Sequence, residues 1–166
     1  MKGLSEKEME IVAHLEFEQK YFFTMDDIKK FFSSYNQRRH TLHKLIQKGR
    51  IVKLNRSKYF LVPVKARTGK WSDHPFIIID EICDGEGYFI GGWAAANYWR
   101  LTDQIPMWRE VYTTKRQGKT KILNTGIIFR RTTKKKIARA VVEEVKGHQF
   151  RIQGKEDSRR WMKSRS

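Results

Sequence analysis

The first 63 residues carry helix-start patterns followed by two strand-like runs, and this order restricts the fold more than any other feature of the chain. Ser5 with Glu8, and Ser34 with Gln37, have the spacing of a capping box, in which each side chain bonds the other residue's backbone amide. Thr24, followed by two aspartates, is a further N-cap candidate. We therefore predict three helices: residues 6–18, a short segment from Thr24 to Phe32, and residues 35–48.

A β-hairpin is predicted directly after the third helix, which Gly49 ends. Two runs of β-branched and aromatic residues, 50–54 and 58–62, flank the polar turn Asn55-Arg56-Ser57. A helix, a short helix, a basic helix and a hairpin occur in this order in a winged helix-turn-helix, whose last helix lies in the DNA major groove. A three-helix bundle with a hairpin that binds another protein is the alternative.

The rest of the chain predicts a second, mixed α/β domain. Residues 64–72 are polar and basic and predict a linker. Helices are predicted over 75–83, 91–98 and 137–145, and strands over 88–90, 109–114 and 122–130. From about residue 154 the chain is polar, and we predict a frayed basic tail. The predicted class is α+β, with a winged helix-turn-helix over residues 1–66 and a small α/β domain over residues 67–166.

The charge is distributed unevenly along the chain. The 166 residues carry a formal net charge of +17, yet residues 1–28 hold three lysines and seven acids. Residues 29–70, the first basic window, hold eight lysines, five arginines and no acid; residues 111–142, the second basic window, hold ten basic residues and no acid. Because like charges at close spacing repel one another, two acid-free windows predict contact with a polyanion.

The third helix offers the residue types that contact DNA bases. At 100° per residue, Tyr35, Leu42, Leu45 and Ile46 share an apolar face, and the opposite face includes His43 and Gln47. Asparagine and glutamine suit adenine, and arginine and lysine suit guanine. Arg38 lies on the apolar edge, where its long side chain can still reach the surface. The predicted DNA-contacting set, including phosphate contacts from the hairpin, is Asn36, Gln37, Arg38, Arg39, His40, Lys44, Lys53, Arg56 and Lys58.

The second basic window has no assigned partner at this point: DNA, RNA and a protein all remain open. Its basic residues are Lys115, Arg116, Lys119, Lys121, Arg130, Arg131, Lys134, Lys135 and Lys136, followed by Arg139.

Few other residues indicate chemistry. Asp80, Glu81, Asp84 and Glu86 form an acidic cluster that would suit a metal-dependent nuclease, but such acids more often form the polar face and end of a helix. No phosphate-binding glycine loop or metal motif is present, so we expect no cofactor, no metal and no catalysis. The single cysteine, Cys83, and the lack of an apolar leader or an 18-residue apolar stretch predict a cytoplasmic protein without a membrane segment.

Part of the second domain resembles a known family. The segments Tyr88 to Ala96, Arg100-Leu101-Thr102-Asp103-Gln104-Ile105-Pro106, Arg109 to Arg116 and Gly126 to Phe129 resemble the AbiEi-type antitoxins, the transcriptional regulators of type IV (AbiE) toxin–antitoxin systems. The resemblance covers roughly residues 5–130. Trp99-Arg100 stands where the family commonly has His-Gly, and the chain ends about where the family continues into further helices.

This resemblance implies an N-terminal domain that binds operator DNA and a C-terminal domain that acts against a nucleotidyltransferase-like toxin. Because of the short C-terminus, we expect DNA binding to be retained more readily than toxin neutralisation. The leading hypothesis is a sequence-specific DNA-binding repressor, for which a homodimer on double-stranded operator DNA is one common arrangement. The alternative is an antitoxin or interaction module that binds a toxin or RNA through residues 111–142.

Overall fold

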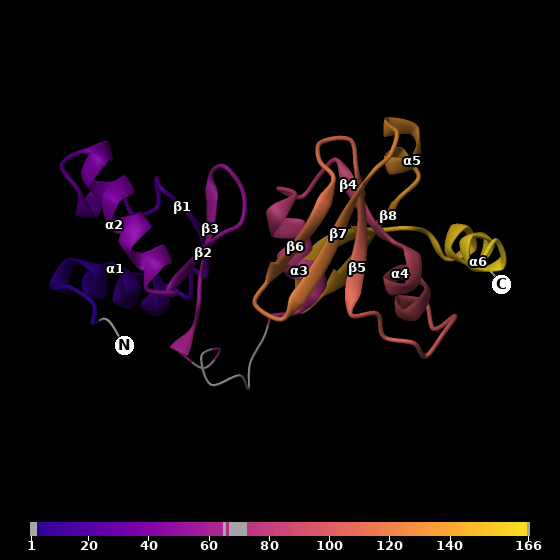
Figure 1. The fold of residues 1–166 in the computed structure, drawn as a ribbon, viewed down its shortest axis with the longest axis horizontal. Helices are drawn as coiled ribbons and strands as arrows, with labels where there is room; N and C mark the ends of the chain where they lie inside the picture. The colour runs from indigo at the N-terminus through magenta and orange to yellow at the C-terminus, as the bar shows by residue number, and fades with distance from the viewer. Residues whose placement is uncertain (1–2, 65, 67–72, 166) are drawn as a thin grey trace. The chain divides into compact units, whose positions relative to one another are not determined.

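The computed structural model describes residues 3–64, 66 and 73–165, and it shows a mixed α/β protein with two sheets. The chain divides into two compact units, residues 1–72 and 73–166 (Figure 1). Most of the predicted linker over residues 64–72, and the domain boundary predicted after residue 66, lie outside the described residues.

The first unit combines two helices with a three-stranded antiparallel sheet of order β1-β3-β2. Its elements are α1 (Glu6–Phe17), β1 (Phe22–Thr24), the 3-10 turn η1 (Lys29–Phe31), α2 (Tyr35–Gln47), β2 (Ile51–Lys53) and β3 (Lys58–Leu61). The predicted helix limits at residues 6–18 and 35–48 are confirmed to within one residue, and so is the hairpin.

The helix caps follow the sequence patterns. Ser5 and Glu8 form the full capping box of α1. At α2 only half of the predicted box forms: Ser34 accepts from the Gln37 amide at 3.3 Å, while the Gln37 side chain accepts from the Ser33 hydroxyl at 2.8 Å. Gly49 follows α2 with a φ of +70°, a conformation that favours glycine and turns the chain into β2.

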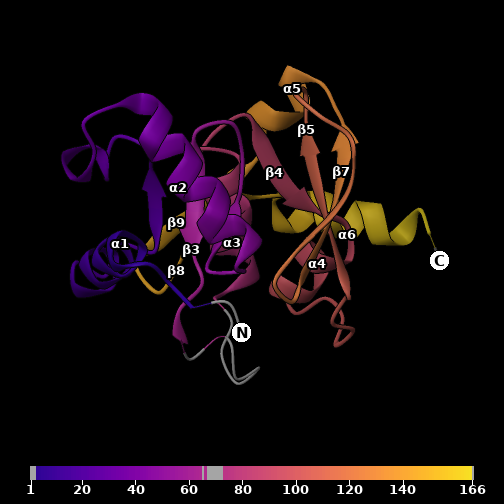
Figure 2. The same ribbon diagram turned by 60° about the vertical axis from the view of Figure 1, so that its left-hand side comes forward.

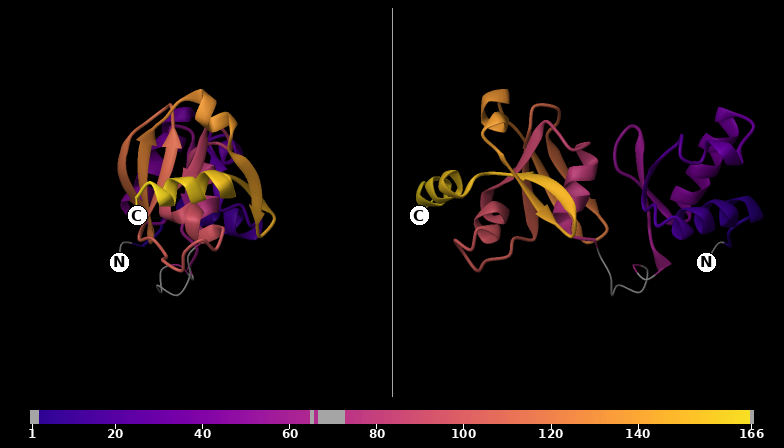
Figure 3. Two further views of the ribbon diagram at one scale, coloured as in Figure 1. Left: turned by 90° about the vertical axis from the view of Figure 1, so that its right-hand side faces the viewer. Right: turned by 180° about the vertical axis from the view of Figure 1, so that it is seen from behind.

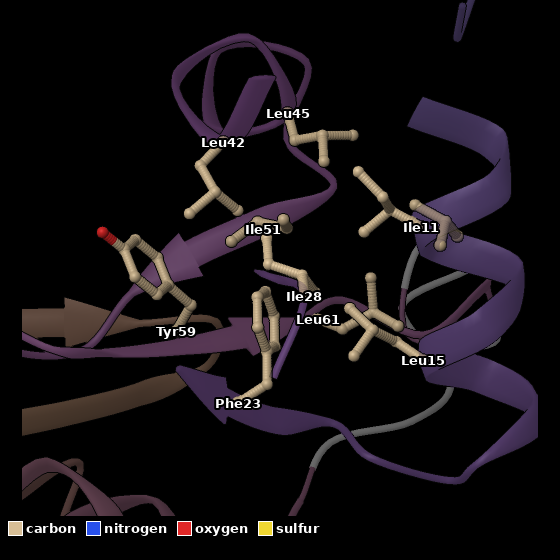
Figure 4. Packing of buried hydrophobic residues seen from close by; sticks show 10 residues of the cluster. Ile11, Leu15, Phe23, Ile28, Leu42, Leu45, Ile51, Tyr59 and Leu61 are labelled. Atoms are coloured by element: carbon tan, nitrogen blue, oxygen red, sulfur yellow. The ribbon is translucent and has the colours of Figure 1, made fainter. Parts of the chain in front are cut away.

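One apolar cluster holds α1, α2 and the sheet together. Ile11 and Leu15 of α1 meet Leu42 and Leu45 of α2 over the strands, while Tyr59 lies at the edge of the cluster with its hydroxyl directed away from α1 (Figure 4). Tyr35, which we predicted on the apolar face of its helix, is 58% exposed, so this prediction is wrong; Met9 of α1 is likewise 54% exposed.

The predicted short second helix is also wrong. Phe22–Thr24 is a strand, because its backbone pairs with β3, with Phe23 opposite Tyr59. Thr24 does not cap a helix; instead its amide and its hydroxyl both donate to the Asp27 carboxylate, at 2.7 and 3.0 Å. Only the single turn η1 follows before α2 begins.

The second unit is built on a six-stranded mixed sheet of order β6-β7-β5-β4-β9-β8, and β5 and β7 run parallel side by side (Figure 2). Helix α3 packs on β9 and β7, while α4 packs on β4, β5 and α6. The elements are α3 (Pro75–Ile82), β4 (Tyr88–Gly91), α4 (Gly92–Tyr98), β5 (Trp108–Thr113), β6 (Gly118–Ile122), β7 (Thr125–Arg131), α5 (Lys134–Ala138), β8 (Val141–Val145), β9 (His148–Ile152) and α6 (Lys155–Lys163).

The predictions for residues 75–114 are confirmed, but three later ones are wrong. The strand predicted over 122–130 is β7, which begins only at Thr125, and residues 118–122, most of which we did not predict as a strand, form β6. The helix predicted over 137–145 is the end of α5 followed by strand β8, because Lys146 and Gly147, both with positive φ, turn the chain back into β9.

The tail predicted to fray from residue 154 is the helix α6, visible in yellow next to the C-terminus in Figure 3. Ser158 on its inner side is fully buried. Its first turn carries Glu156 and Asp157 and its last turn Arg160 and Lys163, a distribution that complements the helix dipole.

Candidate nucleic-acid interface

The outer face of α2 is polar and exposed. Its exposed residues include five of the predicted DNA contacts, Asn36, Gln37, Arg39, His40 and Lys44. They are exposed because α2 buries the opposite side, Leu42 and Leu45, against α1 and the sheet. Amide, imidazole and guanidinium groups on one helix face are the groups that hydrogen-bond base edges.

The hairpin presents a second set of cations next to this helix face. Lys53 and Arg56 are exposed and Lys58 is half-buried. The turn between the strands is ordered by Asn55, whose Oδ1 accepts from the amides of Ser57 and Lys58 at 3.0 and 2.9 Å. The polar turn of the sequence therefore fixes the position of Arg56 at the hairpin tip.

A groove of about 560 Å³ separates the helix face from the hairpin. It is lined from α2 by Asn36, Arg39, His40, Leu42, His43 and Ile46, and from the hairpin by Lys53 and Tyr59. Of the nine predicted contacts, the groove brings together four. The other five lie outside it: Gln37, Arg38, Lys44, Arg56 and Lys58. No acidic residue is among the described residues that line it.

His43 and Tyr59 were not in the predicted contact set, although both line the groove. The helical period had already placed His43 on the polar face. Tyr59 had no such pattern, because it follows from strand pairing: it lies opposite Lys53 across the hairpin. Burial and the neighbouring Tyr35 raise the pKa of Tyr59 above 10, and the positive charge of Arg39 opposes this shift. The phenol is therefore a neutral hydrogen-bonding group beside a cation.

Arg38 is a correction to the predicted contacts, because the structure turns it inward. Its side chain is 9% exposed, and Nη1 donates to the Met25 carbonyl at 2.8 Å and lies 3.4 Å from Asp26 Oδ1. This arginine fastens α2 to the turn before it. A residue so buried is not available to DNA.

Two other cations of the first basic window are also used internally. Lys48 Nζ lies 2.5 Å from Glu8 Oε2, and Arg50 Nη2 lies 3.5 Å from Glu16 Oε1. Both acids belong to α1, so the acidic N-terminal segment pairs with the inward-facing cations behind α2. The exposed cations Arg39, Lys44, Lys53 and Arg56 have no ion pair among the described residues.

The Glu8 carboxylate is nearly inaccessible, with 1% of the residue exposed. Burial by itself raises the pKa of Glu8, but hydrogen bonds from Lys48 and from the Ser5 backbone outweigh it and leave the pKa below its ordinary value. The pair is therefore charged in the folded protein at neutral pH, and it joins the start of α1 to the end of α2.

The second basic window does not form one surface. Arg130 Nε lies 2.9 Å from Glu110 Oε2, an acid from the neighbouring strand β5. The Arg116 guanidinium lies 4.0 Å from the centre of the Phe129 ring, and Lys119 Nζ lies 5.7 Å from the Trp108 ring. Lys121 borders a separate hollow near Trp108, and Lys115 follows β5 in a loop. Only Arg131 and Lys136 of the predicted set line one hollow together, and Lys134 and Lys135 are exposed beside them on α5.

Asp80, in the predicted acidic cluster, links elements of the second unit. Asp80 accepts from the Tyr88 hydroxyl at 2.7 Å, and His148 Nε2 lies 2.8 Å from its other oxygen, which fastens α3 to β4 and β9. Among the described residues, no three His, Cys, Asp or Glu side chains converge as ligands for a metal ion. Burial and the charge of Asp80 raise the pKa of Cys83 to about 12, so this thiol stays protonated at neutral pH.

Comparison with known proteins does not assign the chain to a family. No protein-family model matches the chain, and no curated protein is significantly similar to it. Within the described residues, no helix has both the length and the apolar character needed to cross a membrane.

Proposed function

We propose that the first unit is a winged helix that binds double-stranded DNA, and that the chain acts as a sequence-specific transcriptional regulator, most simply a repressor. The order α1-β1-η1-α2-β2-β3 with the sheet order β1-β3-β2 supports this proposal. In this arrangement α2 is the recognition helix and the β2–β3 hairpin is the wing.

The observation that carries the proposal is the groove between α2 and the hairpin. It combines base-type hydrogen-bonding groups from α2 with Lys53 from the hairpin, and no acid lines it. Asn36, Arg39, His40 and His43 would contact bases. Lys53 and the cations outside the groove, Lys44, Arg56 and Lys58, would contact phosphates, which set affinity and not sequence preference.

Binding of a duplex library by the full chain and by two variants tests this proposal. Arg39→Gln should relax the sequence preference, whereas Lys121→Gln, a matched change in the second unit, should leave it intact. If Arg39→Gln has the same preference and affinity as the unchanged protein, α2 is not the helix that contacts the bases.

The resemblance to AbiEi-type antitoxins adds a second proposed partner, a nucleotidyltransferase-like toxin. The second basic window, residues 111–142, is a weaker candidate for one continuous partner surface, because Arg130 pairs with Glu110 and Arg116 lies over the Phe129 ring. Co-purification with the product of a neighbouring gene tests this proposal. A protein that elutes alone in the presence of that product would contradict it.

A further inference from the structure

The second unit contains a hollow of about 270 Å³ between α5, α6 and the sheet, just below the range of about 300–1,000 Å³ that is typical of ligand sites. Three aromatic residues line it: Phe89, Tyr112 and Trp161. Phe89 and Tyr112 are partners on adjacent strands, and their rings stack with centres 5.0 Å apart and planes 8° apart. Tyr112 and Trp161 are half-buried, so part of each side chain is exposed, and the Arg165 guanidinium lies 4.7 Å from the centre of the Trp161 ring.

The positions of these rings are set by their neighbours. A Cβ on Gly91 would lie 2.7 Å from Cε2 of Tyr112, so only glycine leaves room for that ring. The Tyr112 hydroxyl donates to Glu110 at 2.6 Å. The Trp161 ring meets Trp93 of α4 edge to face, with centres 5.1 Å apart. The aromatic lining is thus held in place before any ligand arrives.

Cations form another part of the lining. Arg131, Lys136 and Arg139 come from the end of β7 and from α5 and the residue after it. One acid, Asp157, is also present, but it is shared by Arg139, at 2.8 Å, and Arg160. Within the described part of the chain Lys136 Nζ has no hydrogen bond or ion pair. The hollow therefore has an excess of positive charge, which favours an anion.

Gln153 adds a polar group with unused hydrogen-bonding capacity. Its backbone is fixed, because the amide donates to the Ile90 carbonyl at 2.8 Å and the carbonyl accepts from Trp99 Nε1 at 2.7 Å. Its side-chain Oε1 is buried and has no hydrogen-bond partner among the described residues. Buried amide oxygens are nearly always bonded, so a rotation of this side chain toward the hollow would give Oε1 the donor that it lacks among the described residues.

We propose that this hollow binds a nucleotide. A planar base would contact the aromatic side, with Gln153 Oε1 accepting from an amino or imino group at its edge, and the phosphate would pair with Arg131 and Lys136. Two sources supply this chemistry: a free nucleoside phosphate, or an unpaired nucleotide of a single strand. This site lies within the second unit and does not depend on the groove proposed to bind duplex DNA.

Isothermal titration calorimetry on the full chain tests the proposal with four probes: AMP, ATP, ribose 5-phosphate and a single-stranded RNA hexamer. A nucleotide or the hexamer should bind about 5- to 150-fold more tightly than ribose 5-phosphate, because stacking of one base contributes about 1–3 kcal/mol. AMP or ATP binding as tightly as the hexamer identifies a free nucleotide as the ligand, and a hexamer that binds far more tightly identifies a strand. Equal binding of ribose 5-phosphate, or no binding of any probe at millimolar concentration, overturns the proposal.

Two variants locate the site. Lys136→Gln should weaken nucleotide binding by about tenfold, as expected for a lost charge-assisted bond, while Lys135→Gln, its exposed neighbour outside the hollow, should change binding less than twofold. Gln153→Leu should weaken AMP binding and leave that of ribose 5-phosphate unchanged. Equal losses for Lys135→Gln and Lys136→Gln would show general charge attraction and overturn the site. Arg39→Gln should leave nucleotide binding intact, which separates this test from that of DNA binding.

Discussion

The two basic windows of this chain are alike in composition, because both are rich in Lys and Arg and lack acids, but they differ in where the fold places their cations. In the first, the side chains of Arg38, Lys48 and Arg50 are 9%, 17% and 7% exposed and pair with acids of the same unit, whereas Arg39, Lys44, Lys53 and Arg56 are exposed. In the second, Arg130 pairs with Glu110, and other cations lie over aromatic rings. A stretch of sequence that lacks acidic residues therefore does not by itself form a basic surface.

The difference follows from the periodicity of the elements. A helix gathers residues three and four apart on one face, so α2 places Asn36, Arg39, His40 and His43 together. A strand alternates its side chains between two faces, and its neighbours contribute residues from distant segments. Glu110 lies outside the second window in sequence, yet strand pairing brings it next to that window's Arg130.

The largest expected effect comes from an internal cation of the first window. Lys48→Met leaves the buried Glu8 carboxylate without its partner and should lower the free energy of unfolding by about 3 kcal/mol, as for other broken buried pairs. Lys44→Met, one turn earlier on the exposed face, should change it by less than about 0.5 kcal/mol. Urea denaturation measures both, and equal losses would contradict the division into inner and outer cations.

The same pair predicts a dependence of stability on pH. The folded-state pKa of Glu8 lies below the ordinary value of 4.5, so its contribution is complete above that pH and is lost as the pH falls through the folded-state value. The protein should therefore be more stable than Glu8→Gln at pH 7, and the difference in the free energy of unfolding should narrow as the pH falls below 4.5. A difference that stays constant as the pH falls means that the Glu8 charge does not contribute.

On the outer face, the base contacts should affect discrimination more than overall affinity. Arg39→Gln and His40→Ala should each reduce the preference for the best duplex over a single-mismatch duplex by about 1–3 kcal/mol. Fluorescence anisotropy with both duplexes measures this difference. Gln37→Ala, on the same helix but outside the groove, should have a smaller effect; if it has the largest, the groove is not the contact site.

The hairpin cations should produce the smallest change. Lys53→Gln should weaken binding to all duplexes equally and reduce the slope of log affinity against log salt by about 1, as expected for one lost phosphate contact. Lys119→Gln in the second unit should leave the slope unchanged. If Lys119→Gln reduces the salt slope by the same amount, the second basic window also contacts DNA phosphates.

Local patterns predicted much of the first unit because they act over a few residues. The capping box of α1, the Ser34 cap, Gly49 and the Asn55 turn all appear where the sequence indicates. The exposure of the α2 contacts follows from the helical period. The inward turn of Arg38 does not, because its partner is the Met25 carbonyl, 13 residues earlier.

The second unit was harder to predict because its strands are defined by distant partners. Strand β9 pairs in parallel with β4, more than 50 residues earlier in the chain, and no local pattern shows this. Residues 141–145 contain both glutamates and valines, and they pair as a strand because β9 follows after a two-residue turn. The Lys146-Gly147 pair was the available signal for this hairpin. Likewise, the lining of the hollow comes from five elements, so no sequence motif marks it.

The most direct test of the central claim is selection of bound fragments from a random duplex library by the full chain at 50 mM and 200 mM salt. The groove between α2 and the hairpin predicts one enriched motif at both salt concentrations, which disappears in Arg39→Gln while general affinity remains. Binding without any enriched motif, lost uniformly at 200 mM salt, would show that the protein binds DNA by charge alone and would contradict the claim.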